Sequence, residues 1–229
     1  MNNIIFDVDK TLIDSSTTEI NAMRIALKSV LGRNYSYEDI ASLSVLTTDD
    51  FFNKFNITHN DRQLVEDKWN HLLEINPINC FPGIIDTIKE LHSDKKKLFI
   101  VTSRKKEEVE TLLNGNLSAI LPYFNSVITS DMVKNHKPSP DSLLKLIYDN
   151  NLNPKETIYI GDGIVDSDTV INTNVELNKN GLDGIAFGYA MWDKHDNYSN
   201  FKKIDYSFEK PTDIPSVLSK KGQKIKNLH

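Results

Sequence analysis

Two aspartates, Asp7 and Asp9, follow directly on the apolar run Ile4, Ile5 and Phe6 near the N-terminus. Two carboxylates at the end of a buried strand are unfavourable unless a positive group, usually a divalent metal, lies between them. In an open α/β sheet, ligands bind beyond the carboxyl ends of the strands, which is where both aspartates would emerge. The pattern therefore indicates a metal-dependent site that handles phosphate. The alternative is that the carboxylates only cap a following helix.

Further polar groups follow other apolar runs and would reach the same edge of a sheet. They are Thr102 and Ser103 after the second run, Asp162 and Asp166 after the fourth, and Lys137 in a Lys-Pro-Ser-Pro segment between these runs. Carboxylates can bind a metal, a hydroxyl with backbone amides can bind oxygens, and a cation can neutralise charge. Phosphoryl transfer requires these three kinds of group.

Five apolar runs predict β-strands, at residues 3–6, 98–101, 126–129, 157–160 and 184–187. Helical patterns, in which apolar residues are spaced by three and four, lie between most of these runs. Strands that alternate with helices in this way predict an α/β fold with a doubly wound, Rossmann-like parallel sheet.

The stretch between the first two predicted strands is the exception to this alternation. It contains no convincing strand and has helical patterns throughout, with Ile20, Met23 and Leu27 on one apolar face. An insert of this size predicts a separate all-helical domain at residues 15–79. Residues 1–14 and 80–229 would then form the Rossmann-like core.

Composition excludes several classes of protein. The chain has 229 residues and a net charge of −5, which argues against nucleic acid as a partner because phosphate backbones need a basic surface. No apolar stretch approaches the length of about 18 residues that a membrane span requires. One cysteine, Cys80, and no signal-peptide pattern before the first strand predict a cytoplasmic protein. No pattern indicates an obligate assembly, so we expect a monomer or a weak dimer.

With its polar residues in this order, the chain resembles the haloacid dehalogenase-like phosphatase superfamily. The four motifs of that superfamily match Asp7-Val8-Asp9-Lys10-Thr11, the hydroxyl of Thr102, Lys137, and Asp162 with Asp166. Each motif alone is common, but the four in sequence, each after the expected strand, are specific. The resemblance extends from residue 3 to about residue 190.

The helical insert resembles the α-helical cap of the subfamily that includes phosphoglycolate phosphatase and β-phosphoglucomutase. Phe81-Pro82-Gly83 is similar to the return from that cap, and Gly188-Tyr189-Ala190 is similar to a Gly-Tyr-Gly that follows the last core strand.

The resemblance implies a phosphatase that hydrolyses a small phosphate monoester through an aspartyl-phosphate intermediate. Asp7 would be the nucleophile, and Asp9 would protonate the leaving group and later deprotonate the attacking water. The implied cofactor is Mg²⁺, held by Asp7, Asp162 and the backbone carbonyl of Asp9. Asp166 would act indirectly, by orienting a metal-bound water or Lys137.

The resemblance also implies a binding site for the transferred phosphoryl group. The Thr102 hydroxyl and the Ser103 amide would hold its oxygens, and Lys137 would offer positive charge to these oxygens and to Asp7. Among the six histidines, only His136 has a place near this site, and a structural role is favoured for it.

Two features, at Lys10 and in segment 168–181, depart from the family pattern, and a third, Thr11, concerns the loop after Asp7. Lys10 stands where capped members of the family usually have glycine, so its backbone would have to avoid φ values that favour glycine. The Thr11 hydroxyl is expected to fix the loop. The segment 168–181 is longer than the corresponding family helix and rich in asparagine, which predicts an extra turn or loop.

Two other hypotheses stay open at this point. A phosphomutase resembling β-phosphoglucomutase would need specific sugar contacts from the insert, and its candidate cations there are Arg24, Lys28 and Lys54. A non-catalytic phosphoacceptor or binding protein, similar to a response-regulator receiver, also gathers acidic residues at strand ends. Receivers, however, lack a large insert after the first strand.

Overall fold

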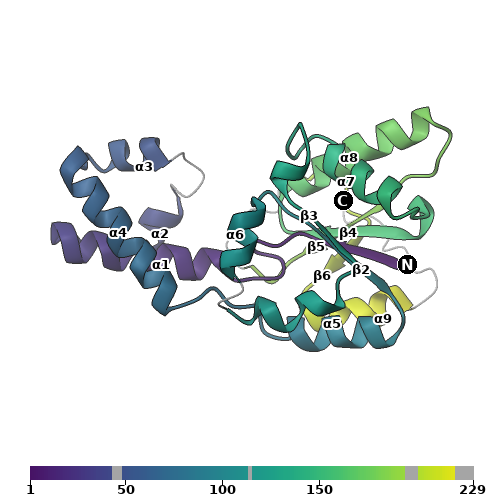
Figure 1. Cartoon of the computed structure of the whole chain (residues 1–229), viewed down its shortest axis with the longest axis horizontal. Helices are drawn as coiled ribbons and strands as arrows, with labels where there is room; N and C mark the ends of the chain where they lie inside the picture. The colour runs from purple at the N-terminus through teal and green to yellow at the C-terminus, as the bar shows by residue number, and fades with distance from the viewer. Residues whose placement is uncertain (43–47, 113–114, 194–200, 220–229) are drawn as a thin grey trace. The chain divides into compact units, whose positions relative to one another are not determined.

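The computed structural model describes residues 1–42, 48–112, 115–193 and 201–219 (Figure 1). Contacts divide the chain into two compact units. The first, which we call the core unit, is formed by Met1–Ile13 and Cys80–His229, and the second, the helical unit, is Asp14–Asn79. Among the described residues, no helix has the length and apolar character needed to cross a membrane.

A single parallel sheet forms the centre of the core unit. In the described residues it has six strands in the order β3-β2-β1-β4-β5-β6. The strands are β1 (Asn3–Phe6), β2 (Lys97–Val101), β3 (Ser126–Ile128), β4 (Thr157–Gly161), β5 (Ala186–Ala190) and β6 (Tyr206–Phe208). Every residue of β1 and β4 is buried, as expected for strands covered on both faces.

Helices cover both faces of the sheet, as Figure 1 shows. The helices of the core unit are α5 (Ile84–Ser93), α6 (Lys106–Thr111), α7 (Asp141–Asp149), α8 (Ile164–Lys179) and α9 (Ile214–Ser219). Helices α7 and α8 lie on one face, and α5 and α9 lie on the other. This arrangement confirms the predicted α/β fold with a doubly wound parallel sheet.

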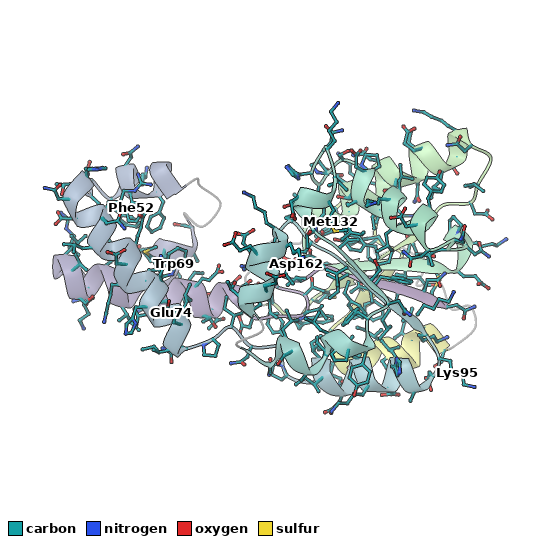
Figure 2. The ribbon with its side chains drawn as sticks, viewed as in Figure 1. Phe52, Trp69, Glu74, Lys95, Met132 and Asp162 are labelled. Carbon is teal, nitrogen blue, oxygen red and sulfur yellow. The ribbon has the colours of Figure 1, made fainter. Side chains whose placement is uncertain are left out.

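The helical unit contains α1 (Ser15–Leu31), α2 (Tyr37–Ala41), α3 (Thr48–Lys54) and α4 (His59–Ile75). The Asp14 carboxylate caps α1 by accepting a hydrogen bond from the Thr17 N–H, and Gly32 ends this helix with a φ of 66°. The unit has its own apolar core, in which Phe52 is buried and against which Trp69 packs partly buried (Figure 2). The insert is therefore all-helical in its described residues, as the sequence predicts.

The ends of the sheet differ from the sequence prediction in two respects. Strand β5 begins two residues later than predicted, because the Asn174 side chain binds both the N–H and the carbonyl of Ile185. Gly188, Tyr189 and Ala190 consequently lie inside β5 and do not follow the last strand, since β6 comes after them. Strand β6 has only three residues, Tyr-Ser-Phe, which is too short for a strand pattern to be recognised in the sequence.

The prediction of an extra turn in segment 168–181 is wrong. Helix α8 runs without interruption from Ile164 to Lys179. Its asparagines bind neighbouring backbone: Asn174 fixes Ile185, and the Asn172 amide donates to the Pro138 carbonyl at 2.9 Å. The C-terminal lysine run and His195 lie outside the described residues.

Leu27 and Ile25 offer a test of the core of the helical unit, because they lie two residues apart on α1. Leu27 is fully buried, whereas Ile25 is half exposed. Leu27→Ala should lower the free energy of unfolding of this unit by about 2–5 kcal/mol, because it leaves a cavity. Ile25→Ala should change it by about 0.5 kcal/mol or less.

Urea unfolding in a Trp192→Phe background measures this difference. Trp69 is then the remaining tryptophan and reports on the helical unit. Equal destabilisation by the two substitutions would contradict the described packing of α1.

Candidate active site

The predicted site residues lie at the carboxyl end of β1, where the strand order continues through β2 on one side and through β4 on the other. Strand β1 lies between β2 and β4, and Asp7, Thr102 and Asp162 each follow one of these three strands. The Asp7 N–H donates to the Ile160 carbonyl at 2.9 Å, which fixes Asp7 at the sheet edge. Such a switch point, at the carboxyl ends of parallel strands, is where open α/β sheets bind ligands.

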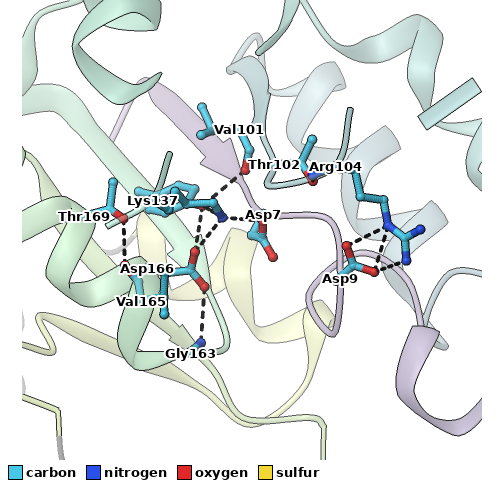
Figure 3. A network of polar contacts seen from close by, with 11 residues as sticks. Asp7, Asp9, Val101, Thr102, Arg104, Lys137, Gly163, Val165, Asp166 and Thr169 are labelled. Atoms are coloured by element: carbon cyan, nitrogen blue, oxygen red, sulfur yellow. Dashed lines mark hydrogen bonds and ion pairs between the residues drawn. The ribbon is translucent and has the colours of Figure 1, made fainter. Parts of the chain in front are cut away.

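The ammonium of Lys137 is the centre of a buried polar network (Figure 3). Its Nζ lies 2.7 Å from Asp7 Oδ1, 2.8 Å from Asp166 Oδ1 and 2.7 Å from Tyr159 Oη. An ammonium has three N–H donors, so these three oxygens engage all of them. Only 4% of the Lys137 side chain is exposed. Burial alone would lower the pKa of Lys137, but the carboxylates of Asp166 and Asp7 raise it well above its usual value.

Asp166 is held from three sides at the start of α8. Its Oδ1 accepts from Lys137 and, at 2.9 Å, from the Tyr159 hydroxyl, while its Oδ2 accepts from the Gly163 N–H at 3.2 Å. The carboxylate packs directly on Gly161, where an added Cβ would lie 2.4 Å from Asp166 Oδ2. A side chain at position 161 would therefore displace Asp166. These contacts are consistent with the predicted indirect role, in which Asp166 orients Lys137.

Three buried carboxylates, those of Asp7, Asp162 and Asp166, approach closely enough to share a cation. One oxygen from each lies within 4.8 Å of the others. Lys137 supplies one positive charge against these three groups, so the cluster has an excess of acidic oxygens. Hard divalent cations such as Mg²⁺ prefer this kind of donor set, so the residues fit the implied metal.

The loop that follows Asp7 is tight, and two expectations about it are corrected. Lys10 has a φ of 57°, so it adopts the left-handed conformation that a non-glycine residue was expected to avoid. The Thr11 hydroxyl is buried and has no hydrogen-bond partner in the described structure. The loop is fixed instead through the Thr11 carbonyl, which accepts from the Trp192 indole N–H at 3.0 Å.

Asp9 points away from the Lys137 network and pairs with Arg104 (Figure 3). Arg104 Nε donates to both carboxylate oxygens, at 2.8 and 3.1 Å, and Nη2 donates to Oδ1. The Asp9 side chain is 33% exposed and that of Arg104 is 19% exposed. The two aspartates of the first motif therefore lie in different surroundings.

The remaining predicted residues lie on the loops after β2 and β3. Thr102 is buried, and its Oγ1 accepts from the Arg104 N–H at 3.1 Å, which leaves the hydroxyl proton available as a donor. Ser103 is exposed. His136 is also exposed, and its carbonyl accepts from the Ser139 N–H at 2.8 Å in the turn after Lys137.

Two residues of the site, Tyr159 and Arg104, were not predicted from the sequence. Tyr159 lies in the middle of the buried strand β4, and a tyrosine in an apolar strand requires a partner for its hydroxyl. That requirement was the available signal, although it does not identify the partner. Arg104 lies two residues after Thr102, and no periodic pattern distinguishes it from the neighbouring Lys105 and Lys106.

Comparisons with known proteins agree with this geometry. A family model described as haloacid dehalogenase-like hydrolase matches residues 4–178. A pyrophosphatase PpaX from Oceanobacillus iheyensis is 28% identical over 216 residues, which cover 94% of this chain and 95% of that protein. A pyrophosphatase PpaX from Bacillus mycoides is 26% identical over 96% of this chain and 98% of its own length.

Solved structures show the same fold at lower identity. A HAD-superfamily hydrolase of subfamily IA from Geobacter sulfurreducens has a TM-score of 0.71 and 18% identity, and the match covers 95% of this chain and 96% of that one. A provisionally named β-phosphoglucomutase from Thermotoga maritima has a TM-score of 0.72 and 19% identity, with 95% and 98% covered.

The titration of Asp7 should be visible in the stability of the metal-free protein. Burial raises the pKa of Asp7 from 3.8 to about 7, with Lys137 opposing and Asp166 and Asp9 adding to the increase. A carboxyl group with a higher pKa in the folded state than in the unfolded state stabilises the fold only while it is protonated. The free energy of unfolding should therefore fall as the pH rises from about 4 to about 7.

Urea unfolding in the presence of a chelator, at several pH values, tests this expectation with Asp7→Asn as the control. The asparagine variant does not titrate at position 7, so its stability should decline less across the same pH range. Parallel pH profiles for the wild type and the variant would show that Asp7 ionises with an ordinary pKa.

Proposed function

Because the chain belongs to the haloacid dehalogenase-like hydrolase family, we propose that it is a metal-dependent phosphatase that acts on a small phosphate ester. The observation that carries this proposal is the buried network in which Lys137 joins Asp7 to Asp166 beside Asp162. That network presents a carboxylate, a cation and a set of carboxylate oxygens that could hold a metal at one edge of the sheet. The pyrophosphatases among the relatives support a hydrolase that acts on phosphate groups.

In this proposal, Mg²⁺ would be held by the Asp7 and Asp162 carboxylates and by the Asp9 backbone carbonyl. When bound, it would supply positive charge that reduces repulsion between an incoming phosphate and Asp7. Asp166 would contribute by fixing Lys137 and the start of α8, as its contacts with Lys137 and Gly163 indicate.

Asp7 would attack phosphorus through its free carboxylate oxygen. The bond to the leaving-group oxygen breaks as the bond to Asp7 forms, which gives an aspartyl phosphate. Lys137 already binds Asp7 Oδ1 and therefore orients the carboxylate and partly neutralises the reacting groups. The Thr102 hydroxyl and the Ser103 amide would hold oxygens of the transferred phosphoryl group.

Asp9 would handle the protons of both half-reactions. It would protonate the leaving alkoxide in the first step and remove a proton from the attacking water in the second, which releases phosphate and restores Asp7. Its position two residues after the nucleophile, on a tight loop and with 33% of its side chain exposed, is compatible with access to both.

A phosphomutase is not favoured by the described residues. Its first candidate sugar-binding cation, Arg24, donates to the Tyr35 carbonyl at 3.0 Å and to Asn21 Oδ1 at 3.0 Å, so it has a structural role inside the helical unit. The structural similarity to a provisionally named β-phosphoglucomutase is at 19% identity and concerns the fold. A receiver-like phosphoacceptor does not account for the all-helical insert or for membership of a hydrolase family.

Substitution of the two motif aspartates tests the proposed roles. With Mg²⁺ and a panel of small phosphate esters, Asp7→Asn should lower kcat/KM on the order of 10³-fold or more, because the nucleophile is lost. Asp9→Asn should lower it by about 10²- to 10⁴-fold, the range expected for loss of a general acid and base. A chelator should abolish turnover of the wild type, and added Mg²⁺ should restore it. Release of inorganic phosphate is the measurement.

Asp168→Asn is a matched control, because Asp168 lies on α8 close to Asp166 but pairs with the exposed Lys202. It should keep nearly wild-type activity. Full activity of both Asp7→Asn and Asp9→Asn would contradict the proposal. Conversion of a sugar 1-phosphate to its 6-phosphate isomer with little free phosphate would instead identify a mutase.

A further inference from the structure

Asp9 is held by a contact that must break before the residue can act as a general acid. Both of its carboxylate oxygens accept hydrogen bonds from the Arg104 guanidinium. A group that protonates a leaving oxygen must turn one of its own oxygens toward that atom. Figure 3 shows the Asp9 carboxylate directed at Arg104 and away from Lys137 and Asp166. In this arrangement both oxygens of Asp9 are engaged by another residue.

When Asp9 turns away, the Arg104 guanidinium loses the anion that binds its Nε and Nη2. Only 19% of the Arg104 side chain is exposed. Removal of the anion from a partly buried charged pair is unfavourable. Another anion can replace Asp9, because the planar fork of arginine matches the oxygens of both carboxylate and phosphoryl groups. The partial exposure of Asp9 leaves the pair open to such an anion from solvent.

The backbone of Arg104 is fixed beside the proposed phosphoryl-binding side chain. Its N–H donates to Thr102 Oγ1 at 3.1 Å, and its carbonyl accepts from the Ser130 N–H at 3.0 Å. The guanidinium therefore extends from a loop whose backbone is hydrogen-bonded to residues that follow β2 and β3. If the phosphoryl group of a substrate binds at Thr102, as proposed, its leaving group would lie near Arg104 and Asp9.

We propose that Arg104 restrains Asp9 in the absence of substrate and is transferred to a second anionic group, carried by the leaving group of the substrate. This inference rests on the proposed phosphatase function. It assigns the substrate class: a phosphate ester or anhydride whose leaving group carries an oxyanion, either a second phosphoryl group or a carboxylate. Binding of that oxyanion releases the Asp9 carboxylate, which takes up a proton from solvent and passes it to the leaving oxygen, so the substrate itself releases the general acid.

The test compares leaving groups in the full-length, Mg²⁺-loaded protein. Inorganic pyrophosphate carries a second phosphoryl group, 2-phosphoglycolate carries a carboxylate, and glycerol 2-phosphate carries no second anion. The wild type should have a higher kcat/KM for at least one of the two anionic substrates than for glycerol 2-phosphate. Arg104→Gln should lower kcat/KM for that substrate by about 10- to 100-fold.

The ratio of kcat/KM for the anionic substrate to kcat/KM for glycerol 2-phosphate should fall as well, because glycerol 2-phosphate offers no second anion to the guanidinium. Arg104→Lys, which keeps the charge without the planar fork, should fall between wild type and Arg104→Gln for the anionic substrate. Lys106→Gln, on a highly exposed neighbouring lysine, should leave the ratio of the two kcat/KM values as it is in wild type. Which anionic substrate loses activity identifies the oxyanion as phosphoryl or carboxylate.

Parallel losses on all substrates would overturn this inference, because they would show that Arg104 supports the site whatever the leaving group. A wild type without preference for anionic leaving groups would also overturn it. Either result, obtained together with Asp7-dependent hydrolysis, would leave the proposed phosphatase function intact. If the wild type hydrolysed none of these substrates or other phosphate esters, the proposed function itself would fail.

Discussion

The buried ammonium of Lys137 is the contact on which the whole site depends. It is bound by Asp7 after β1, by Tyr159 within β4 and by Asp166 on α8, so one cation connects three separate elements of the core unit. A buried charge that loses a partner is strongly destabilising. The register of β1 against β4 and the start of α8 are therefore coupled to the geometry of the reacting carboxylate. Any change that moves one of these elements should move Asp7 as well.

The sheet topology explains why the two aspartates of one short motif can have different properties. Asp7 continues the sheet edge through its bond to the Ile160 carbonyl and is nearly inaccessible, whereas Asp9 lies on the following loop and is one-third exposed. Pairs of carboxyl groups in contrasting environments commonly divide the roles of nucleophile and acid. Here the two contrasting environments are those of Asp7 and Asp9, which lie two residues apart after the end of β1. Arg104 binds the more exposed member of the pair, Asp9.

Much of the core unit could be predicted from the sequence because buried parallel strands are continuous apolar runs. The runs that form β1, β2, β3 and β4 differ from the predicted strands by at most one residue at each end. Asp7, Lys137, Asp162 and Asp166 do meet at one edge of the sheet. Lys137 could be predicted from the need to balance buried carboxylates. What could not be predicted depends on tertiary contacts. The short strand β6 and the start of β5 depend on neighbouring chain segments, and residues 168–179 continue helix α8, in which Asn172 and Asn174 bind the backbone of other segments.

The side-chain partners within the site show the same limit. A buried tyrosine requires a hydrogen bond, but that rule does not reveal that Tyr159 would bind both Lys137 and Asp166. The Asp9–Arg104 pair joins residues far apart in the sequence, and nothing local to either of them indicates it. Lys10 was expected to avoid the left-handed conformation and adopts it.

The most direct test of the central claim is to detect the covalent intermediate on Asp7. The Asp9→Asn variant, which would lack the base for the hydrolytic step, is mixed with a substrate that has a good leaving group and Mg²⁺, and is quenched in acid. Mass spectrometry of its peptides should then find a phosphoryl group on the peptide that contains Asp7, and none when Asp7 is also replaced by Asn. A phosphorylated peptide from any other part of the chain, or burst release of leaving group with an unmodified Asp7, would contradict the assignment of Asp7 as the nucleophile.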